Sequence, residues 1–150
     1  MAGTFSSLYY HIVFSTHNRE PLLVPAWSDR MHQYIAGITK DFNDALIRIG
    51  GMPDHVHLVV RLKPDVVVAE FVRVVKANSS KWLNELKDFP GKFAWQRGYG
   101  AFSVSKSNVE QVVHYVEHQA EHHHYRSFQE EFLAFLARHE VEYDERYIWT

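Results

Sequence analysis

Two histidines separated by a single residue give the chain its first chemical signature. His55 and His57 flank Val56 in the run Gly51-Met-Pro-Asp-His-Val-His-Leu-Val-Val60. Apolar residues occupy every second position from 56 to 62, and this period of two predicts a β-strand that sends both imidazoles to one face. Two imidazoles held in parallel can bind one metal ion, but a half-buried strand also often carries polar residues on its open side. The spacing alone leaves both interpretations open.

A tyrosine and an amide form the second candidate pair. Tyr115 and Gln119 are four residues apart in a predicted helix, so both project from one helical face. The same spacing is typical of a tyrosine that packs at the edge of a sheet with its hydroxyl in water. Tyr125 and Gln129 repeat the spacing, but Ser127 between them is a predicted helix cap. The pattern therefore acquires meaning only beside other residues.

Taken together, the two pairs could supply a complete phosphoryl-transfer site. His55, His57 and Gln119 offer two nitrogens and one oxygen to a divalent ion, and Tyr115 stands one helical turn from Gln119. A metal ion can hold phosphodiester oxygens, while a phenol can attack phosphorus. His118 could compete with Gln119 as a ligand, and the later histidines 122–124 are typical either of a metal tract or of a solvated helix end.

The elements that must position these residues follow from periodicity and turn signals. Strands are expected at 8–16, 45–49 and 55–62, with Gly50-Gly51 as the turn of a hairpin, and 93–105 is expected to form a bent or bulged strand pair. Helices are expected at about 25–42 and 66–87. Two Ser-x-x-Glu capping boxes, Ser107 to Glu110 and Ser127 to Glu130, each predict a further helix start. A valine stripe through Ala120 would be the buried side of the first of these helices.

This order predicts an α+β fold. A β-α-β-β-α-β sequence gives a ferredoxin-like sandwich in which helices cover one face of an antiparallel sheet, followed here by C-terminal helices that carry the tyrosine. With 150 residues, 46% of them apolar, residues 1–150 are expected to form one domain. There is no cysteine, which excludes disulfides and thiolate chemistry. No stretch is apolar enough to predict a membrane span, and we expect a cytoplasmic protein.

Charge is distributed unevenly along the chain. The formal net charge is −2, but residues 61–106 hold 9 Lys and Arg against 4 Asp and Glu. A polyanion would therefore dock on this segment. The basic helical stripe and nearby side chains that could stack on unpaired bases make the candidate DNA contacts Arg73, Lys76, Lys87, Trp95, Arg97 and Tyr99. The alternative is that the basic side chains are solvated and that the tryptophan belongs to the core.

Several motifs, in order, resemble one known family. They are Tyr10-His-Ile-Val-Phe-Ser-Thr16, Met52-Pro-Asp-His-Val-His-Leu58, Lys76-Ala-Asn-Ser-Ser80, Trp95-Gln-Arg-Gly-Tyr-Gly-Ala-Phe-Ser103 and Val112-Val-His-Tyr-Val-Glu-His-Gln119. This set resembles the single-tyrosine HUH transposases of small bacterial insertion sequences, the IS200-like type, over nearly the whole chain.

The resemblance implies a metal-dependent enzyme that cleaves and rejoins single-stranded DNA. It implies that Tyr115 forms a 5′-phosphotyrosine, that His55, His57 and Gln119 bind Mg²⁺ or Mn²⁺, and that the protein is a homodimer recognising DNA hairpins, with possible sharing of active sites between subunits. A domesticated repeat-associated or replication-type nuclease would share these motifs. A catalytically silent hairpin-binding protein would share them too.

Overall fold

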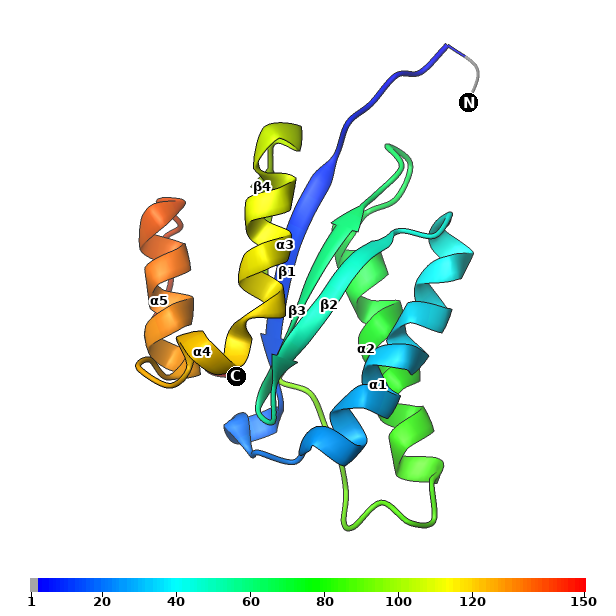
Figure 1. Cartoon of the computed structure of the whole chain (residues 1–150), viewed down its shortest axis with the longest axis vertical. Coiled ribbons are helices and arrows are strands. Elements are labelled where there is room, and N and C mark those ends of the chain that lie inside the picture. The colour runs from blue at the N-terminus through cyan, green and yellow to red at the C-terminus, as the bar shows by residue number, and fades with distance from the viewer. Residues whose placement is uncertain (1–2) are drawn as a thin grey trace.

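The computed structural model describes residues 3–150, which form a four-stranded antiparallel sheet with helices on both faces (Figure 1). The strand order is β2-β3-β1-β4. The strands are β1 (Tyr9–Ser15), β2 (Leu46–Met52), β3 (His55–Arg61) and β4 (Gly100–Val104). The helices are α1 (Pro25–Thr39), α2 (Val68–Glu85), α3 (Val109–Glu117), α4 (Gln119–His122) and α5 (Phe128–Arg138), with short 3-10 turns at His17–Arg19, Lys40–Phe42 and Lys106–Asn108. The predicted ferredoxin-like β-α-β-β-α-β order is confirmed.

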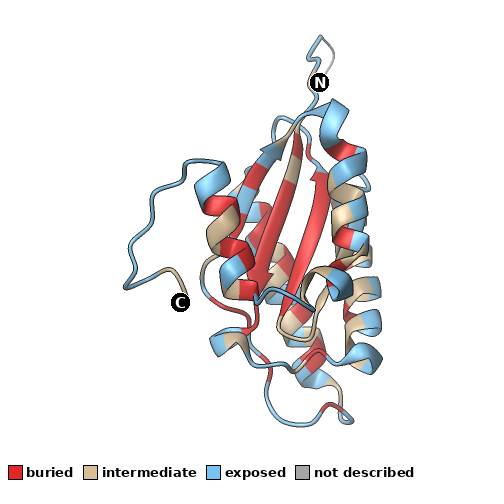
Figure 2. Ribbon diagram, turned by 60° about the vertical axis from the view of Figure 1, so that its left-hand side comes forward, coloured by how far each residue is buried: buried red, intermediate tan, exposed pale blue. Residues whose placement is uncertain are grey.

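One face of the sheet carries a continuous apolar core. Helices α1 and α2 cover this face, and α3, α4 and α5 lie on the opposite side (Figure 1). Ile12 and Phe14 of β1 point into this core with Leu58 of β3 and Phe71 of α2, and all four are fully buried. Central strands that are covered on both sides appear as buried ribbons in Figure 2. The alternation expected for β1 and β3 therefore decides which side chains enter this core.

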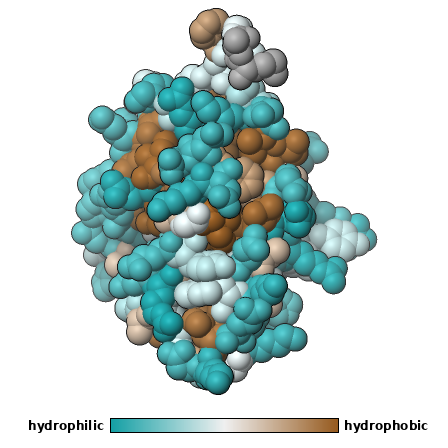
Figure 3. Space-filling view, turned by 90° about the vertical axis from the view of Figure 1, so that its right-hand side faces the viewer, coloured by the Kyte–Doolittle hydropathy of each residue, from teal (hydrophilic) through white to brown (hydrophobic). Residues whose placement is uncertain are grey.

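The outer surface of α1 and α2 is mainly hydrophilic, with apolar groups showing between the polar ones (Figure 3). Such a surface is ordinary for amphipathic helices that bury their other side. Among residues 3–150, no helix combines the length and the apolar character needed to cross a bilayer.

The hairpin turn lies three residues later than predicted. Gly50 and Gly51 belong to β2, and the chain reverses at Pro53 and Asp54. Gly50 is needed for packing rather than for turning, because a Cβ atom at this position would lie 2.3 Å from the carbonyl oxygen of Val116. The glycine thus lets α3 approach the backbone of β2.

The segment 93–105 contains one strand and not the expected pair. Only β4 is regular, and the preceding part makes an isolated bridge between Trp95 and Thr16. Phe93 and Trp95 turn into the apolar core, where each packs edge-on to a neighbouring aromatic ring. Burial of these rings holds the segment in place without a second ladder of backbone hydrogen bonds.

The two predicted capping boxes have different outcomes. Ser127 and Glu130 form the complete capping box that opens α5, as predicted. Ser107 does not cap α3, because residues 106–108 form a 3-10 turn and Asn108 takes the N-cap position without a side-chain hydrogen bond. The predicted long helix also breaks at His118, which leaves Ala120 exposed and turns Gln119 inward.

Candidate active site

His55 and His57 lie on the face of the sheet opposite the apolar core, and both side chains are fully buried. The Nδ1 atom of His55 lies 2.7 Å from Oδ1 of Asp54. Since a carboxylate can only accept, Nδ1 carries the proton and donates it, and the Nε2 lone pair of His55 points into the site. A carboxylate behind an imidazole is a common way to orient a metal-binding histidine.

His57 is held at both ring nitrogens. Its Nδ1 lies 2.7 Å from Nε2 of His11, and its Nε2 lies 2.9 Å from Oε1 of Glu131. Burial lowers the pKa of His57 to about 4, against the opposing influence of Glu131, so the ring is neutral near pH 7. Because His11 can either donate or accept, His57 can adopt the tautomer that frees Nε2 for a metal ion.

Gln119 completes the predicted set of ligands. Its Oε1 lies 3.0 Å from Nε2 of His55 and 3.0 Å from Nε2 of His123. The helix breaks at His118, and Gln119, the first residue of α4, is buried against His55 of β3. The structure thus brings His55, His57 and Gln119 together, as the combined pattern anticipated.

Glu131 of α5 is a site residue that sequence reasoning missed. Its carboxylate is buried between His57 and His123, whose Nε2 lies 3.1 Å from Oε2. Burial would raise the pKa of Glu131, but hydrogen bonds from His123 and His57 outweigh it and hold the pKa far below its usual range. A signal was available, because Glu131 shares the buried face of α5 with Phe128 and Phe132.

The histidine-rich segment after Tyr115 divides between site and surface. His118 turns back to the carbonyl oxygen of His114, 2.7 Å from its Nδ1, and does not reach the ligand cluster. His123 does reach it, although the sequence favoured a solvated helix end for this tract. Ligand atoms of His55, His57, His123 and Glu131 all lie within 4.8 Å of one another. Nitrogen and oxygen donors that converge in this way suit a divalent transition metal ion.

Tyr115 stands directly beside this cluster in the same chain. Its ring centre lies 5.9 Å from that of His57 and 4.2 Å from that of His122, which stacks on it. Its hydroxyl donates a hydrogen bond to Oε2 of Glu131. Burial, assisted by Glu131, raises the pKa of Tyr115 well above its ordinary value. The phenol is therefore protonated at rest and must lose its proton to act as a nucleophile.

Five of the six candidate DNA contacts line one shallow groove on the other side of the sheet. This groove has a volume of about 450 Å³ and includes Arg73, Lys76, Trp95, Arg97 and Tyr99. Lys87 is exposed beyond the end of α2 and does not line it. The predicted basic and aromatic side chains therefore do gather, with one exception.

Two members of the groove have structural partners. Lys76 donates to the carbonyl oxygens of Gln96, Arg97 and Gly98 at 2.9, 3.2 and 2.5 Å, and so anchors this segment to α2. Trp95 is buried, and its Nε1 donates to Oγ of Ser79 over 2.9 Å. A buried ring offers no open face to a base, so Trp95 acts as a core residue here.

Comparison with known proteins supplies the family. The model of the family described as "Transposase IS200 like" matches residues 4–119. The chain belongs to the IS200-like transposase family. The ISDra2 transposase TnpA of Deinococcus radiodurans is 27% identical to this transposase over 122 residues, which cover 78% of this chain and 87% of the relative. The transposase for insertion sequence element IS200 of Salmonella typhimurium is 26% identical over 126 residues, covering 81% and 82%.

Solved structures agree in fold. A putative transposase from Deinococcus radiodurans R1 aligns with a TM-score of 0.60 and 27% identity, covering 79% of this transposase and 95% of that chain. A REP-associated tyrosine transposase bound to a REP hairpin aligns with a TM-score of 0.56 and 16% identity, covering 77% and 70%. The latter similarity concerns the fold alone.

The boundary of the family match divides the site of this transposase. The match ends at Gln119, so His55, His57 and Tyr115 lie inside it. His123 and Glu131 lie beyond it, yet they supply two of the four clustered ligand atoms. The C-terminal helix α5 therefore contributes Glu131 to the site, although it lies outside the residues that the family model matches.

Proposed function

We propose that this transposase cleaves and rejoins single-stranded DNA at hairpin-bearing ends through a 5′-phosphotyrosine on Tyr115. The observation that carries this proposal is the direct hydrogen bond between the Tyr115 hydroxyl and Glu131, whose other oxygen contacts His57. A nucleophile and a set of convergent ligands thus share one carboxylate within a single chain. Such an arrangement suits phosphoryl transfer, where positioning and charge neutralisation supply most of the catalysis.

The cleavage step forms one bond to phosphorus and breaks another. The Tyr115 oxygen bonds to phosphorus, and the bond between phosphorus and the 3′-oxygen breaks. The phenol proton, which rests in a hydrogen bond to Glu131, passes to water as the bond to phosphorus forms, and water returns one proton to the departing 3′-oxygen, which leaves as a hydroxyl group. In the reverse direction a DNA 3′-hydroxyl attacks the phosphotyrosine and restores the phosphodiester, so rejoining needs no external energy source.

We propose His55, His57 and Gln119 as the protein ligands of a divalent cation, Mg²⁺ or Mn²⁺. Asp54 orients His55, the pKa of His57 favours its neutral form, and the Gln119 oxygen already faces His55. When bound, the cation would neutralise charge on the phosphate. Imidazole ligands favour Mn²⁺, whereas oxygen ligands suit both ions, so the mixed set fits Mn²⁺ best.

The proposal also includes hairpin DNA as the bound substrate and a second copy of the chain in a homodimer. The relative solved with a REP hairpin shares this fold, and exposed Arg97 and Tyr99 in the groove beside α2 could contact a DNA strand. A homodimer rests on the family resemblance alone. Since Tyr115 already contacts the histidine cluster of its own chain, dimerisation is not needed to assemble this site.

A covalent adduct is the direct test. The protein is incubated with Mn²⁺ and single-stranded DNA from both flanks of its gene, and adducts are resolved by denaturing electrophoresis and located by peptide mass spectrometry. Tyr115→Phe should abolish the adduct because it removes the attacking oxygen. Tyr125→Phe is the matched control, since Tyr125 is 86% exposed and shares the Tyr-x3-Gln spacing. No adduct with the wild type would contradict the proposed chemistry and favour a hairpin-binding protein.

A further inference from the structure

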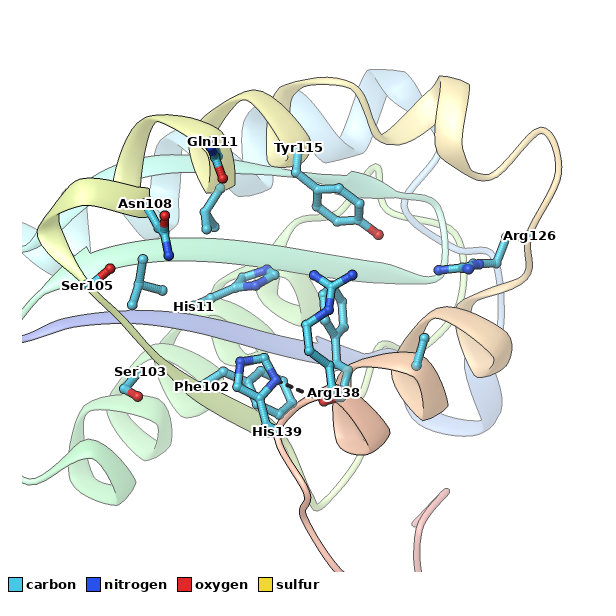
Figure 4. Close-up of a pocket in the computed structure, with 14 residues that line it drawn as sticks. His11, Phe102, Ser103, Ser105, Asn108, Gln111, Tyr115, Arg126, Arg138 and His139 are labelled. Carbon is cyan, nitrogen blue, oxygen red and sulfur yellow. Dashed lines mark hydrogen bonds between the residues drawn. The ribbon is translucent and has the colours of Figure 1, made fainter.

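A cavity of about 340 Å³ opens beside Tyr115 (Figure 4). It lies between α3, β4 and α5, and the Tyr115 ring forms part of its wall. Its volume is near the lower end of the roughly 300–1,000 Å³ typical of small-ligand sites. The cavity therefore has room for one small group beside the nucleophile and not for a folded hairpin.

Two arginines give this cavity its charge. Arg126, just before α5, and Arg138, the last residue of α5, both line it and direct their guanidinium groups toward it (Figure 4). Within residues 3–150, neither guanidinium has a hydrogen-bond or carboxylate partner, whereas Arg30 and Arg146 each pair with an aspartate. An arginine pair that faces a cavity without carboxylate partners is suited to bind an anion, above all a phosphate.

The remaining lining matches the rest of a nucleotide. Phe102 lies at the base, and its ring centre is 4.6 Å from that of the tilted His139 ring and 5.6 Å from that of Phe135. Asn108 and Gln111 add amides from the start of α3, and their side chains make no hydrogen bond with the described part of the chain. The exposed ring of His139 can pack against a base, and amides can hydrogen-bond to base edges. Positive charge, an exposed imidazole and free amides together fit a nucleotide better than an apolar ligand.

We propose that this cavity holds the nucleotide next to the scissile phosphate, with Arg126 and Arg138 binding its phosphate groups and Asn108 and Gln111 contacting its base. The inference rests on the proposed function, because it takes Tyr115 as the nucleophile. Arg126 and Arg138 attract the phosphates of the adjoining nucleotide into the cavity, while the scissile phosphate itself lies at Tyr115 within reach of the proposed cation site.

Binding and cleavage are tested separately. In a Tyr115→Phe background, which cannot form the adduct, the affinity for a fluorescent twelve-nucleotide oligo(dT) is measured by anisotropy at several salt concentrations. Adding Arg126→Ala or Arg138→Ala should lower the slope of log affinity against log salt by about one for each arginine removed from a phosphate. Arg30→Ala on α1 is the matched control, because its guanidinium is paired with Asp88 on the opposite face of the sheet.

Adduct formation is then compared in proteins that retain Tyr115. Arg126→Ala and Arg138→Ala should each slow the adduct about tenfold or more, as expected when a charge-assisted hydrogen bond is removed, and Arg138→Lys should recover part of the rate. Asn108→Ala with Gln111→Ala should flatten the difference in rate between substrates that vary at one base beside the cleavage point.

The outcomes separate the two proposals. If the wild type forms the adduct while the arginine variants match Arg30→Ala in both rate and salt slope, the cavity assignment is overturned and the proposed function stands. If the wild type forms no adduct but the salt slopes fall as expected, the cavity binds DNA and the proposed chemistry fails. Unchanged salt slopes in both variants overturn the cavity assignment whatever the adduct assay gives.

Discussion

The two faces of one sheet do different work in this transposase. Alternate residues of β3 divide between them: Leu58 enters the apolar core beneath α1 and α2, while His55 and His57 face α3 and α5. The buried polar set on the second face also includes Gln119 and Glu131. A two-residue period thus places a stabilising core and a reactive cluster on opposite sides of a single strand.

The polar face is tolerated because its groups satisfy one another. Burying polar groups costs free energy unless they are hydrogen-bonded, and His55, His57, Gln119 and Glu131 all have partners. Among the described side chains, the one buried polar atom left without a partner is Nε2 of His122, which stacks on Tyr115. We therefore expect damage to the first face to cost stability, and damage to the second to cost mainly binding and chemistry.

Phe71→Ala should produce the largest loss of stability. Phe71 is fully buried in the apolar core, so its truncation should lower the free energy of unfolding by about 3–5 kcal/mol through reduced burial and a residual cavity. Urea unfolding followed by circular dichroism measures this loss. The folded variant should keep the Mn²⁺ affinity of the wild type in calorimetry, and a large loss of that affinity would show that the two faces are not separable.

Cation binding to the polar face of the sheet should have the next largest effect on the free energy of unfolding. A Mn²⁺ concentration of 100 times the dissociation constant should raise the free energy of unfolding by about 2.7 kcal/mol, because the ion binds only the folded site. Thermal unfolding with and without the ion measures the gain, and a chelator should reverse it. His55→Ala should remove the gain, whereas His124→Ala, at an exposed histidine outside the ligand cluster, should retain it.

Gly50→Ala should perturb the polar face by way of the backbone. The added Cβ would meet the carbonyl of Val116, so α3 must shift, at a cost of about 1–3 kcal/mol in the free energy of unfolding. The expected readouts are urea unfolding and a slower adduct, since Val116 adjoins Tyr115. Gly37→Ala in α1 is the control: nothing lies within 4 Å of its Cβ position, and it should stabilise the protein by about 0.5–1 kcal/mol.

Lys76→Met should have the smallest effect. It should change only the pH dependence of the free energy of unfolding. Burial lowers the pKa of Lys76 to about 8, below its ordinary value of 10.5. Between these values the unfolded chain binds a proton that the folded chain has released, so the free energy of unfolding should rise with pH. Comparison of urea midpoints from pH 8 to 10 with those of Lys76→Met measures this difference. Equal slopes would contradict it.

Local periodicity was enough to predict most elements and part of the site. The alternation in β3 and the Ser127 capping box report on neighbouring residues, and the structure agrees with both. Gly50 misled the prediction because its role depends on Val116, which approaches only after the chain has folded. Signals that arise from contacts distant in sequence are invisible to a local pattern.

For Glu131 the helical period of α5 indicated a buried position, but nothing local indicated its partners in the site. In the sequence it is one acid in a helix that follows a capping box, and such residues are usually solvated. Its burial depends on α5 packing over β3, which sets its carboxylate beside His57 and Tyr115. The pairing of His55, His57 and Gln119 was predictable because the sheet and the helix that carry them each have a clear periodicity.

The hydrogen bond between His11 and His57 has a spectroscopic consequence. His57 donates a hydrogen bond from Nε2 to Glu131, so its Nδ1 accepts a hydrogen bond from Nε2 of His11. A cation at Nε2 of His57 would move the His57 proton to Nδ1, and His11 would then have to accept where it had donated. His11 also lines the cavity beside Tyr115. Imidazole ¹⁵N shifts of His11 should therefore report ion occupancy from a ring that never touches the ion.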